Sequence, residues 1–271
     1  SALAATSWKD GLRAAGRPSL EQQRSWERSR AVIPSTYRAP EYPYVTPPEI
    51  EAGGVARTQV AIVGAGPVGL AAAIDLAQQG IAFIIVDDNN TVSVGSRAIC
   101  YAKRALEVLD RLGCGEPICA HGVSWKVGKV FFHDKLAYQF DLQPEPGHKR
   151  PAFVNLQQYH LEEALVDRLA ALGHRVRWKN KAVGIEPGKD GAAVEIDTPH
   201  GRYRIEADYV IAADGARSAL RDLMGLEWKG QVFRDRFLIA DVQMKAEFPP
   251  ERWFWFDPPF HPGQSALLHR Q

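Results

Sequence analysis

The alternation of apolar and polar positions divides much of the chain into predicted strands and helices. Near-continuous apolar runs at 59–63 and 81–86 predict two buried strands. Between them, residues 67–79 place Leu70 and Ile74 on one face, which is the spacing of an amphipathic helix. Together the three elements predict a strand–helix–strand unit with two parallel strands.

The rest of the chain continues with shorter elements. We expect helices at 101–112 and 157–172, and strands at 123–142 (a hairpin or paired strands), 175–178, 182–186, 192–197, 203–213, 237–244 and 252–256. Turns separate the strands between 182 and 213, and this pattern predicts an antiparallel meander. The aromatic residues at 253–256 alternate across the faces of a strand, so two of them are candidates for a pocket, although packing is the commoner role.

Residues 1–57 form a predicted N-terminal arm. Residues 19–33 predict a short, mostly polar helix with Ser19 as its cap. The proline-rich stretch at 38–54 predicts extended chain. The arm carries several tryptophans and tyrosines, which indicate that it docks on the main domain or forms a subunit contact.

Composition and charge exclude several classes of protein. The chain has 271 residues, is 45% apolar and carries a formal net charge of +1, so neither nucleic acid nor an anionic membrane is an expected partner. The uncharged stretch at 58–74 is short for a membrane span and is interrupted by glycine and proline. The three cysteines have no metal-type spacing, so we expect reduced thiols, no metal site and a cytoplasmic location.

The candidate chemistry begins in the turn after the first buried strand. There the chain carries a GxGxxG pattern, made of Gly64, Gly66, Pro67, Val68 and Gly69 around Ala65. The first glycine permits the tight turn, the second lets the backbone approach a pyrophosphate, and the third lets helix and strand pack closely. The helix N-terminus offers unpaired N–H groups to the phosphates. A glycine-rich turn without a ligand is the alternative, but the flanking strand and helix favour a dinucleotide site.

Acidic residues at two predicted strand ends complete this hypothesis. Asp87 follows the second strand, where an acid can bind a ribose hydroxyl, and Asp88 is a rival for that role. Asp214 and Gly215 follow the apolar run at 209–213, at the end of a strand that would face the same crevice. A turn-forming Asp-Gly pair is the alternative for Asp214. The motif alone does not separate FAD from NAD.

Four segments together carry a family resemblance. They are GAGPVGL, the Ser-Arg-Ala segment, NLQQYHLEEAL and the segment around the Asp-Gly pair. From about Tyr42 to its end the chain resembles group A FAD-dependent aromatic hydroxylases, and most of all enzymes of the 3-(3-hydroxyphenyl)propionate hydroxylase type. The resemblance implies an α/β, FAD-binding Rossmann-like domain of the two-dinucleotide-binding, glutathione-reductase type at 58–225, with an antiparallel meander. It also implies that the strands at 123–150 contribute to a β-sheet substrate domain, which begins again at 226–271.

The resemblance also implies roles for single residues. Ser96 and Arg97 would lie at the FAD pyrophosphate or ribityl chain, where a guanidinium pairs well with phosphate oxygens. Gln158 would bind the ribityl chain or a phosphate, and Val183 would pass the adenine with its backbone. Asp214 and Gly215 would serve both FAD and the nicotinamide cofactor, and Ser218 would cap the helix that follows.

The implied activity is hydroxylation of a phenolic or other aromatic ring. NAD(P)H would reduce FAD, O2 would react at the flavin to give a C4a-hydroperoxide, and the protein would orient the flavin and exclude water. No catalytic residue can be named from the sequence.

The sequence also departs from the family pattern. The family's later Gly-Asp motif does not occur in these 271 residues, so we expect an N-terminal portion of a longer enzyme, whose site a complementary C-terminal chain would restore. A homo-oligomer is the alternative partner. Two alternatives stay open. One is a flavin dehydrogenase or halogenase on the same scaffold, and the other is a nucleotide-binding module without catalysis of its own.

Overall fold

The computed structural model describes residues 37–94, 98–143, 146–231, 233, 235, 237–242, 244–245 and 247–271. The predicted helix at 19–33 and the predicted site residues Ser96 and Arg97 lie outside the described residues. The chain divides into two compact units. The smaller contains Trp125–Gln143 and Phe248–Arg270, and the larger contains Ala39–Ser124 and Pro144–Glu247.

The larger unit is built on a six-stranded sheet of order β8-β2-β1-β11-β10-β9. Its strands are β1 (Val55–Val63), β2 (Phe83–Asp87), β8 (Arg177–Trp178), β9 (Lys181–Pro187), β10 (Ala192–Thr198) and β11 (Gly201–Ala212). β2 and β11 both pair with β1 in parallel, and β2 pairs with β8 in parallel. β9, β10 and β11 form the antiparallel meander that the turns predicted.

The second half of β1, residues 60–63, is buried on both faces, which explains why this part of the sequence is continuously apolar. Successive side chains of a strand point to opposite faces, so Ile62 enters the core cluster on one side and Val63 the cluster on the other. Ile62 is completely buried. Burying such a side chain contributes about 1.5–3 kcal/mol.

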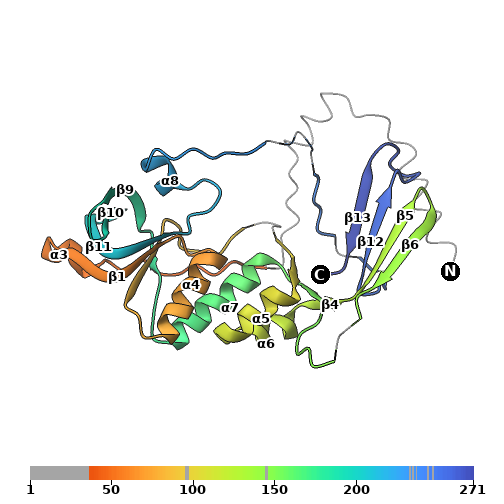
Figure 1. Ribbon diagram of the computed structural model, residues 1–271, viewed down its shortest axis with the longest axis horizontal. Helices are drawn as coiled ribbons and strands as arrows, with labels where there is room; N and C mark the ends of the chain where they lie inside the picture. Colours follow the sequence, from red (N-terminus) through yellow and green to blue (C-terminus); the bar gives the residue numbers. More distant parts are fainter. Residues whose placement is uncertain are drawn as a thin grey trace. The chain divides into compact units, whose positions relative to one another are not determined.

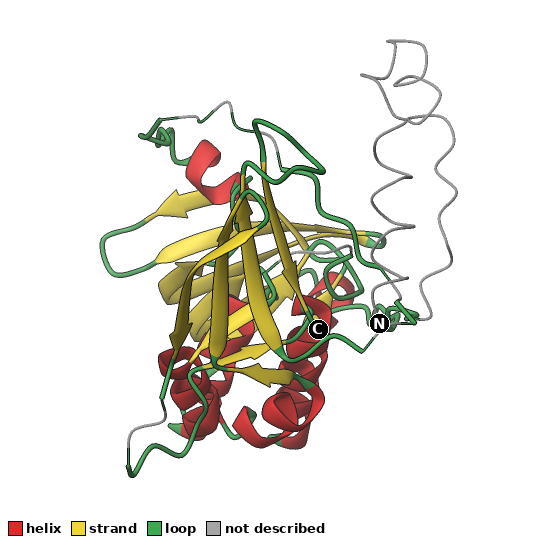
Figure 2. Cartoon of the chain, turned by 90° about the vertical axis from the view of Figure 1, so that its right-hand side faces the viewer, coloured by secondary structure: helices red, strands yellow, loops and turns green. Residues whose placement is uncertain are grey.

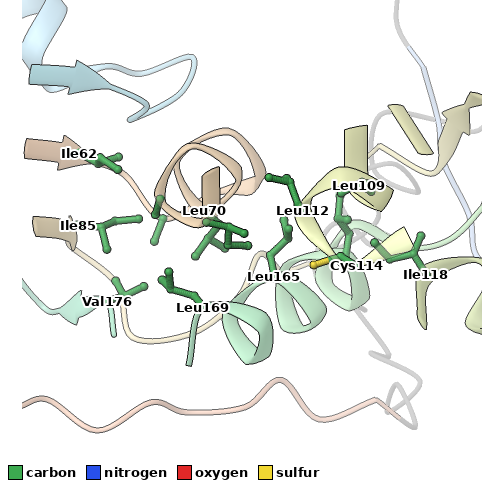
Figure 3. Close-up of a cluster of buried hydrophobic side chains, with 14 of the residues drawn as sticks. Ile62, Leu70, Ile85, Leu109, Leu112, Cys114, Ile118, Leu165, Leu169 and Val176 are labelled. Atoms are coloured by element: carbon green, nitrogen blue, oxygen red, sulfur yellow. The ribbon is translucent and has the colours of Figure 1, made fainter. Parts of the chain in front are cut away.

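Four helices gather on one side of the parallel strands (Figure 1). They are α4 (Pro67–Gln78), α5 (Lys103–Leu112), α6 (Gly115–His121) and α7 (Gln158–Ala171). Figure 3 shows Ile62 and Ile85 of the sheet gathered with Leu70 of α4 and Leu165 and Leu169 of α7 in one apolar cluster. This cluster therefore fixes α4, and with it the turn that precedes α4, against the sheet.

The opposite face of the sheet is covered differently. The second cluster joins β1 and β2 to the meander strands and to Leu220 of the short α8 (Ala219–Leu223). α8 lies apart from the other helices in both overall views (Figures 1 and 2). A three-stranded sheet of order β3-β7-β4 is formed by β3 (Cys100–Ala102), β7 (Phe153–Asn155) and β4 (Val123–Trp125).

The described part of the N-terminal arm docks on the larger unit. The Tyr42 ring stacks on Trp178, with ring centroids 4.7 Å apart. The arm then forms α3 (Pro48–Ala52), where Glu49 accepts hydrogen bonds from the Arg177 guanidinium at 3.1 and 3.2 Å. Tyr203 accepts a third hydrogen bond from Arg177. These contacts hold the arm to the strands β8 and β11.

The smaller unit is a four-stranded sheet of order β13-β12-β5-β6. Its strands are β5 (Val127–Phe132), β6 (Lys135–Asp141), β12 (Glu251–Phe256) and β13 (Ser265–His269). Trp253 and Trp255 both contact Phe131, at centroid distances of 5.5 and 5.2 Å, whereas Phe254 lies against Arg252. The predicted alternation of aromatic residues across this strand is confirmed, and packing accounts for both tryptophans.

Two sequence predictions differ from the structure. Residues 237–242 are not a strand, because a strand needs a neighbour that completes its backbone hydrogen bonds and no described segment pairs with them. The division between the units near the C-terminal end falls after Glu247, whereas the sequence placed it after residue 225. None of the helices in the described part of the chain has the length and apolar character needed to cross a bilayer.

Candidate dinucleotide-binding site

The turn between β1 and α4 is built on glycines that accept no side chain. Gly64 has φ +103°, and a Cβ there would overlap the backbone carbonyl of Ala213. A Cβ on Gly69 would overlap the carbonyl oxygen of Gly64. The turn is therefore pressed against β11 on one side and against its own helix on the other, which is the close packing that the motif predicted.

Gly66 differs from its two neighbours. A Cβ built on it would meet no protein atom within 4 Å, so the space above it is open. Gly66 is the N-cap of α4, and no side chain caps the helix there. Pro67 occupies the first helical position and Val68, in the first turn, is 70% exposed. An open helix N-terminus with uncapped donors fits the phosphates of a dinucleotide.

Asp87 ends β2 directly beside this turn. Its carboxylate accepts hydrogen bonds from the backbone N–H of Ala65 at 2.6 Å and of Asn89 at 2.8 Å. Burial raises the pKa of Asp87, and the charges of Asp88 and Glu162 add to the rise. The two hydrogen bonds lower the pKa but do not cancel the effect of burial. Asp88 is exposed, and its side chain accepts a hydrogen bond from Asn89 Nδ2. Of the two rivals, only Asp87 contacts the glycine turn.

Asp214 lies on the other side of the turn, because β11 is the other neighbour of β1. Its Oδ2 accepts a hydrogen bond from the Leu220 N–H at 3.0 Å, so one carboxylate oxygen caps α8. Gly215 follows with φ +78° and open space around it. Ser218 accepts a hydrogen bond from the Arg221 N–H, which confirms the predicted cap.

Val183 is placed close to the same end of the sheet by the start of β9. The N–H of Asn180, just before β9, donates to the carbonyl oxygen of Asp87 at 2.8 Å. The β9–β10 register shifts between Glu195 and Ile196, which pair with Gly184 and Ala182. Val183 is therefore the extra residue of a β-bulge, and a bulged residue is left out of the ladder.

Gln158 is the first residue of α7, and its amide is not free. Its Nε2 donates to Oε1 of Glu162 at 2.7 Å. The other oxygen, Glu162 Oε2, accepts from the backbone N–H of Ser93 at 2.5 Å. Glu162 was not among the residues predicted for the site, although its i, i+4 spacing from Gln158 is a signal for such a pair.

The structure thus brings the glycine turn, Asp87 and Asp214 together at one edge of the parallel strands. The glycine turn lies between the ends of β2 and β11, with Asp87 on one side and Asp214 on the other. Ligands of open α/β sheets bind outside the carboxyl ends of the strands. The backbone N–H groups of the turn fit the phosphates of a dinucleotide such as FAD, and the two carboxylates fit its hydroxyl groups. Within the described residues, no group of three metal-binding side chains is present.

Comparison with known proteins agrees with this geometry. Residues 57–265 match the family described as the FAD binding domain. A flavin-dependent monooxygenase of Mycobacteroides abscessus is 32% identical over 193 residues, which cover 68% of this chain and 41% of that protein. A 3-(3-hydroxy-phenyl)propionate/3-hydroxycinnamic acid hydroxylase of Mycolicibacterium smegmatis is 28% identical over 184 residues, with 68% and 33% covered.

A solved structure shows the same relationship in three dimensions. The p-nitrophenol 4-monooxygenase of Pseudomonas putida superposes with a TM-score of 0.61 and 29% sequence identity. The superposition covers 66% of this chain and 46% of that one. In each of these three comparisons the chain spans less than half the length of the relative.

Proposed function

This chain belongs to the FAD-binding domain family, and from that premise we propose that it forms the FAD site of a monooxygenase that hydroxylates a phenolic ring with O2 and NAD(P)H. The observation that carries the proposal is the glycine turn itself. Gly64 and Gly69 are closed in by backbone, whereas Gly66 faces open space at an uncapped helix N-terminus. Such a turn accepts a pyrophosphate against its backbone.

The neighbouring residues supply the other contacts of the proposed site. Asp87 accepts from a ribose hydroxyl with the lone pairs that Ala65 and Asn89 leave free. The bulged backbone at Val183 is available to the adenine edge. Asp214 and Gly215 reach the cofactor from the β11 side of the turn. Exposed Asp88 serves as a second contact at the ribose end.

Ser96 and Arg97 keep the roles that the family resemblance assigned to them, at the phosphates and ribityl chain. Bound FAD supplies the redox and oxygen-activating chemistry, while the chain orients the cofactor and keeps water from it. No residue of this chain is proposed as an acid or base.

The names of the relatives support a phenolic substrate. They include 3-(3-hydroxy-phenyl)propionate hydroxylases and a para-nitrophenol 4-monooxygenase of Pseudomonas. A phenol is electron-rich, which suits the transfer of an electrophilic oxygen from a flavin. None of the three cysteines, all of which lie within the described residues, forms a disulfide, which supports a cytoplasmic location.

FAD binding by the 271-residue chain tests the cofactor site. Gly66→Ala, Gly66→Val and the wild-type chain would be titrated with FAD and followed by flavin fluorescence. Because no protein atom surrounds a Cβ at Gly66, we expect both variants to unfold at the wild-type urea concentration while their FAD affinity falls at least about tenfold. Unchanged affinity in Gly66→Val would show that no phosphate lies on this turn.

Phenol-stimulated oxidation of NAD(P)H tests the proposed reaction. The chain, loaded with FAD and combined with the C-terminal part of the enzyme that the family resemblance implies, would be mixed with NAD(P)H and a series of phenols, with O2 uptake and ring hydroxylation measured together. A hydroxylated product that appears only with O2 and NAD(P)H is expected. A preparation that binds FAD but hydroxylates no phenol in the series would contradict the monooxygenase assignment and leave the cofactor site standing.

A further inference from the structure

Glu162 is a buried carboxylate between two segments of the proposed FAD site. It lies on α7 and is only 4% exposed. One oxygen accepts from the backbone N–H of Ser93 and the other from the Gln158 amide. It therefore ties a helix residue to a loop that is distant in sequence, with both oxygens engaged.

A buried carboxylate is costly and needs a reason. Moving an ionised carboxylate away from water costs several kcal/mol unless hydrogen bonds replace its hydration. An apolar residue at this position of α7 would pack against the same core without that cost. The two donors that Glu162 meets are a backbone N–H and an amide, and both belong to segments that the family resemblance places at the cofactor.

The contact also settles how the Gln158 amide is oriented. An ionised carboxylate only accepts hydrogen bonds, so the NH2 end of Gln158 must face Glu162. The carbonyl oxygen of Gln158 is then the end turned away from the carboxylate. A carbonyl oxygen accepts from a hydroxyl group and repels a phosphate oxygen, so this orientation favours a hydroxyl partner.

We infer that Glu162 is a positioning residue for FAD: it turns the Gln158 carbonyl oxygen toward a ribityl hydroxyl and fixes the backbone at Ser93. This inference rests on the proposed FAD site. It adds a residue that does not touch the cofactor and acts through two others. It also selects the ribityl chain, rather than a phosphate, as the partner of Gln158.

A binding experiment with matched variants tests this role. Wild type, Glu162→Gln and Glu163→Gln would be titrated with FAD, and the urea midpoint of each FAD-free protein measured. Glu163 is the neighbouring carboxylate on α7, pairs with His160 and serves as the control. Glutamine at 162 can satisfy only one of the two donors, so we expect the FAD Kd to rise about tenfold in Glu162→Gln and to stay unchanged in Glu163→Gln.

A double-mutant cycle separates positioning from stability. If Glu162 acts through the Gln158 amide, Glu162→Gln should weaken FAD binding by a smaller factor in the Gln158→Ala background than in wild type. The visible circular dichroism of bound FAD should also change in Glu162→Gln, because the ribityl contact is altered.

The outcomes of these experiments are distinct. Wild-type affinity in Glu162→Gln would overturn the inference, and so would a full effect in the Gln158→Ala background. Should Glu162→Gln fail to fold, Glu162→Asp, which keeps the charge, would be measured in its place. If neither variant folds, the carboxylate serves the fold and the positioning role is wrong. A wild-type chain that binds no FAD would instead defeat the proposed function, and this inference with it.

Discussion

The backbone N–H of Ala65 donates to the carboxylate of Asp87 across 2.6 Å, which joins the glycine turn to the end of the neighbouring strand. Asp87 is thus both a support for the turn and a candidate ligand for a ribose. In Asp87→Asn one backbone N–H loses its acceptor, at a cost of about 1–3 kcal/mol. We expect a lower urea midpoint and an FAD Kd raised about tenfold or more.

Asp88→Asn is the matched comparison for this change, because Asp88 is the next residue and carries the same carboxylate on an exposed side chain. Its stability should equal that of the wild-type chain, and its FAD affinity should fall less than in Asp87→Asn because Asp88 is only the second contact at the ribose end. Equal losses of FAD affinity in the two variants would show that the acids share the ribose, and a loss in Asp88→Asn alone would transfer the role to Asp88.

Gly64 and Gly80 provide a second pair of variants. Both have positive φ, +103° and +70°, but only Gly64 is crowded by neighbouring backbone. Gly80→Ala should cost about 1–2 kcal/mol for the left-handed conformation alone. Gly64→Ala should cost a further ~1–3 kcal/mol because its methyl group overlaps the Ala213 carbonyl. Urea unfolding measures both, and equal losses would contradict the close contact of the turn with β11.

The strand–helix–strand unit was predictable because its signals are local. The apolar runs that predict β1 and β2, the helical spacing of Leu70 and Ile74, and the glycines between them all act over a few residues. The meander was predictable for the same reason, since turns mark each of its strands. These signals, the Ser-Arg-Ala segment and the α7 sequence carried the family resemblance. The match to the FAD binding domain family confirms it.

Features that depend on distant segments could not be predicted. The role of Glu162 depends on Ser93, 69 residues away in the chain. The bulge at Val183 depends on the register of β10. Residues 237–242 have the apolar composition of a strand, but composition does not reveal whether a partner strand lies beside them. The short α6 and β7 lack a clear period and were missed.

The pair between Asp110 and Arg150 predicts a pH-dependent contribution to stability. Arg150 is 7% exposed, and its guanidinium donates to both Asp110 oxygens and to Glu116. The hydrogen bond from Arg150 holds the pKa of Asp110 below its usual range. The folded state therefore binds this proton less readily than the unfolded state, so the contribution is present above about pH 4 and is lost as the pH falls.

Asp110→Asn should accordingly lower the free energy of unfolding by about 2–3 kcal/mol at neutral pH. The difference from wild type should shrink as the pH falls below about 4, because Asp110 of the unfolded wild-type chain takes up a proton there while Asp110 of the folded chain stays ionised to lower pH. Urea unfolding at a series of pH values measures this difference. Glu107→Gln, in the exposed pair with Arg104, should change stability by under about 0.5 kcal/mol throughout. A difference that is constant with pH would contradict the ion pair.

The burial of Cys114 predicts that its thiol is protected from chemical modification more strongly than the thiol of Cys100. Cys114 is 1% exposed within the core between α5, α6 and α7, and burial raises its pKa to about 11. Only a thiolate attacks a disulfide reagent, and at pH 8 the fraction of a thiol that is ionised falls tenfold for each unit by which its pKa rises. Cys114 of the native chain should therefore react at least about 100-fold more slowly at pH 8 than Cys114 of the unfolded chain. Cys100 is only partly buried and should be modified first. Timed labelling followed by peptide mass spectrometry distinguishes the two sites. If Cys114 of the native chain is modified as early as Cys100, the helices around Cys114 open readily and the prediction is wrong.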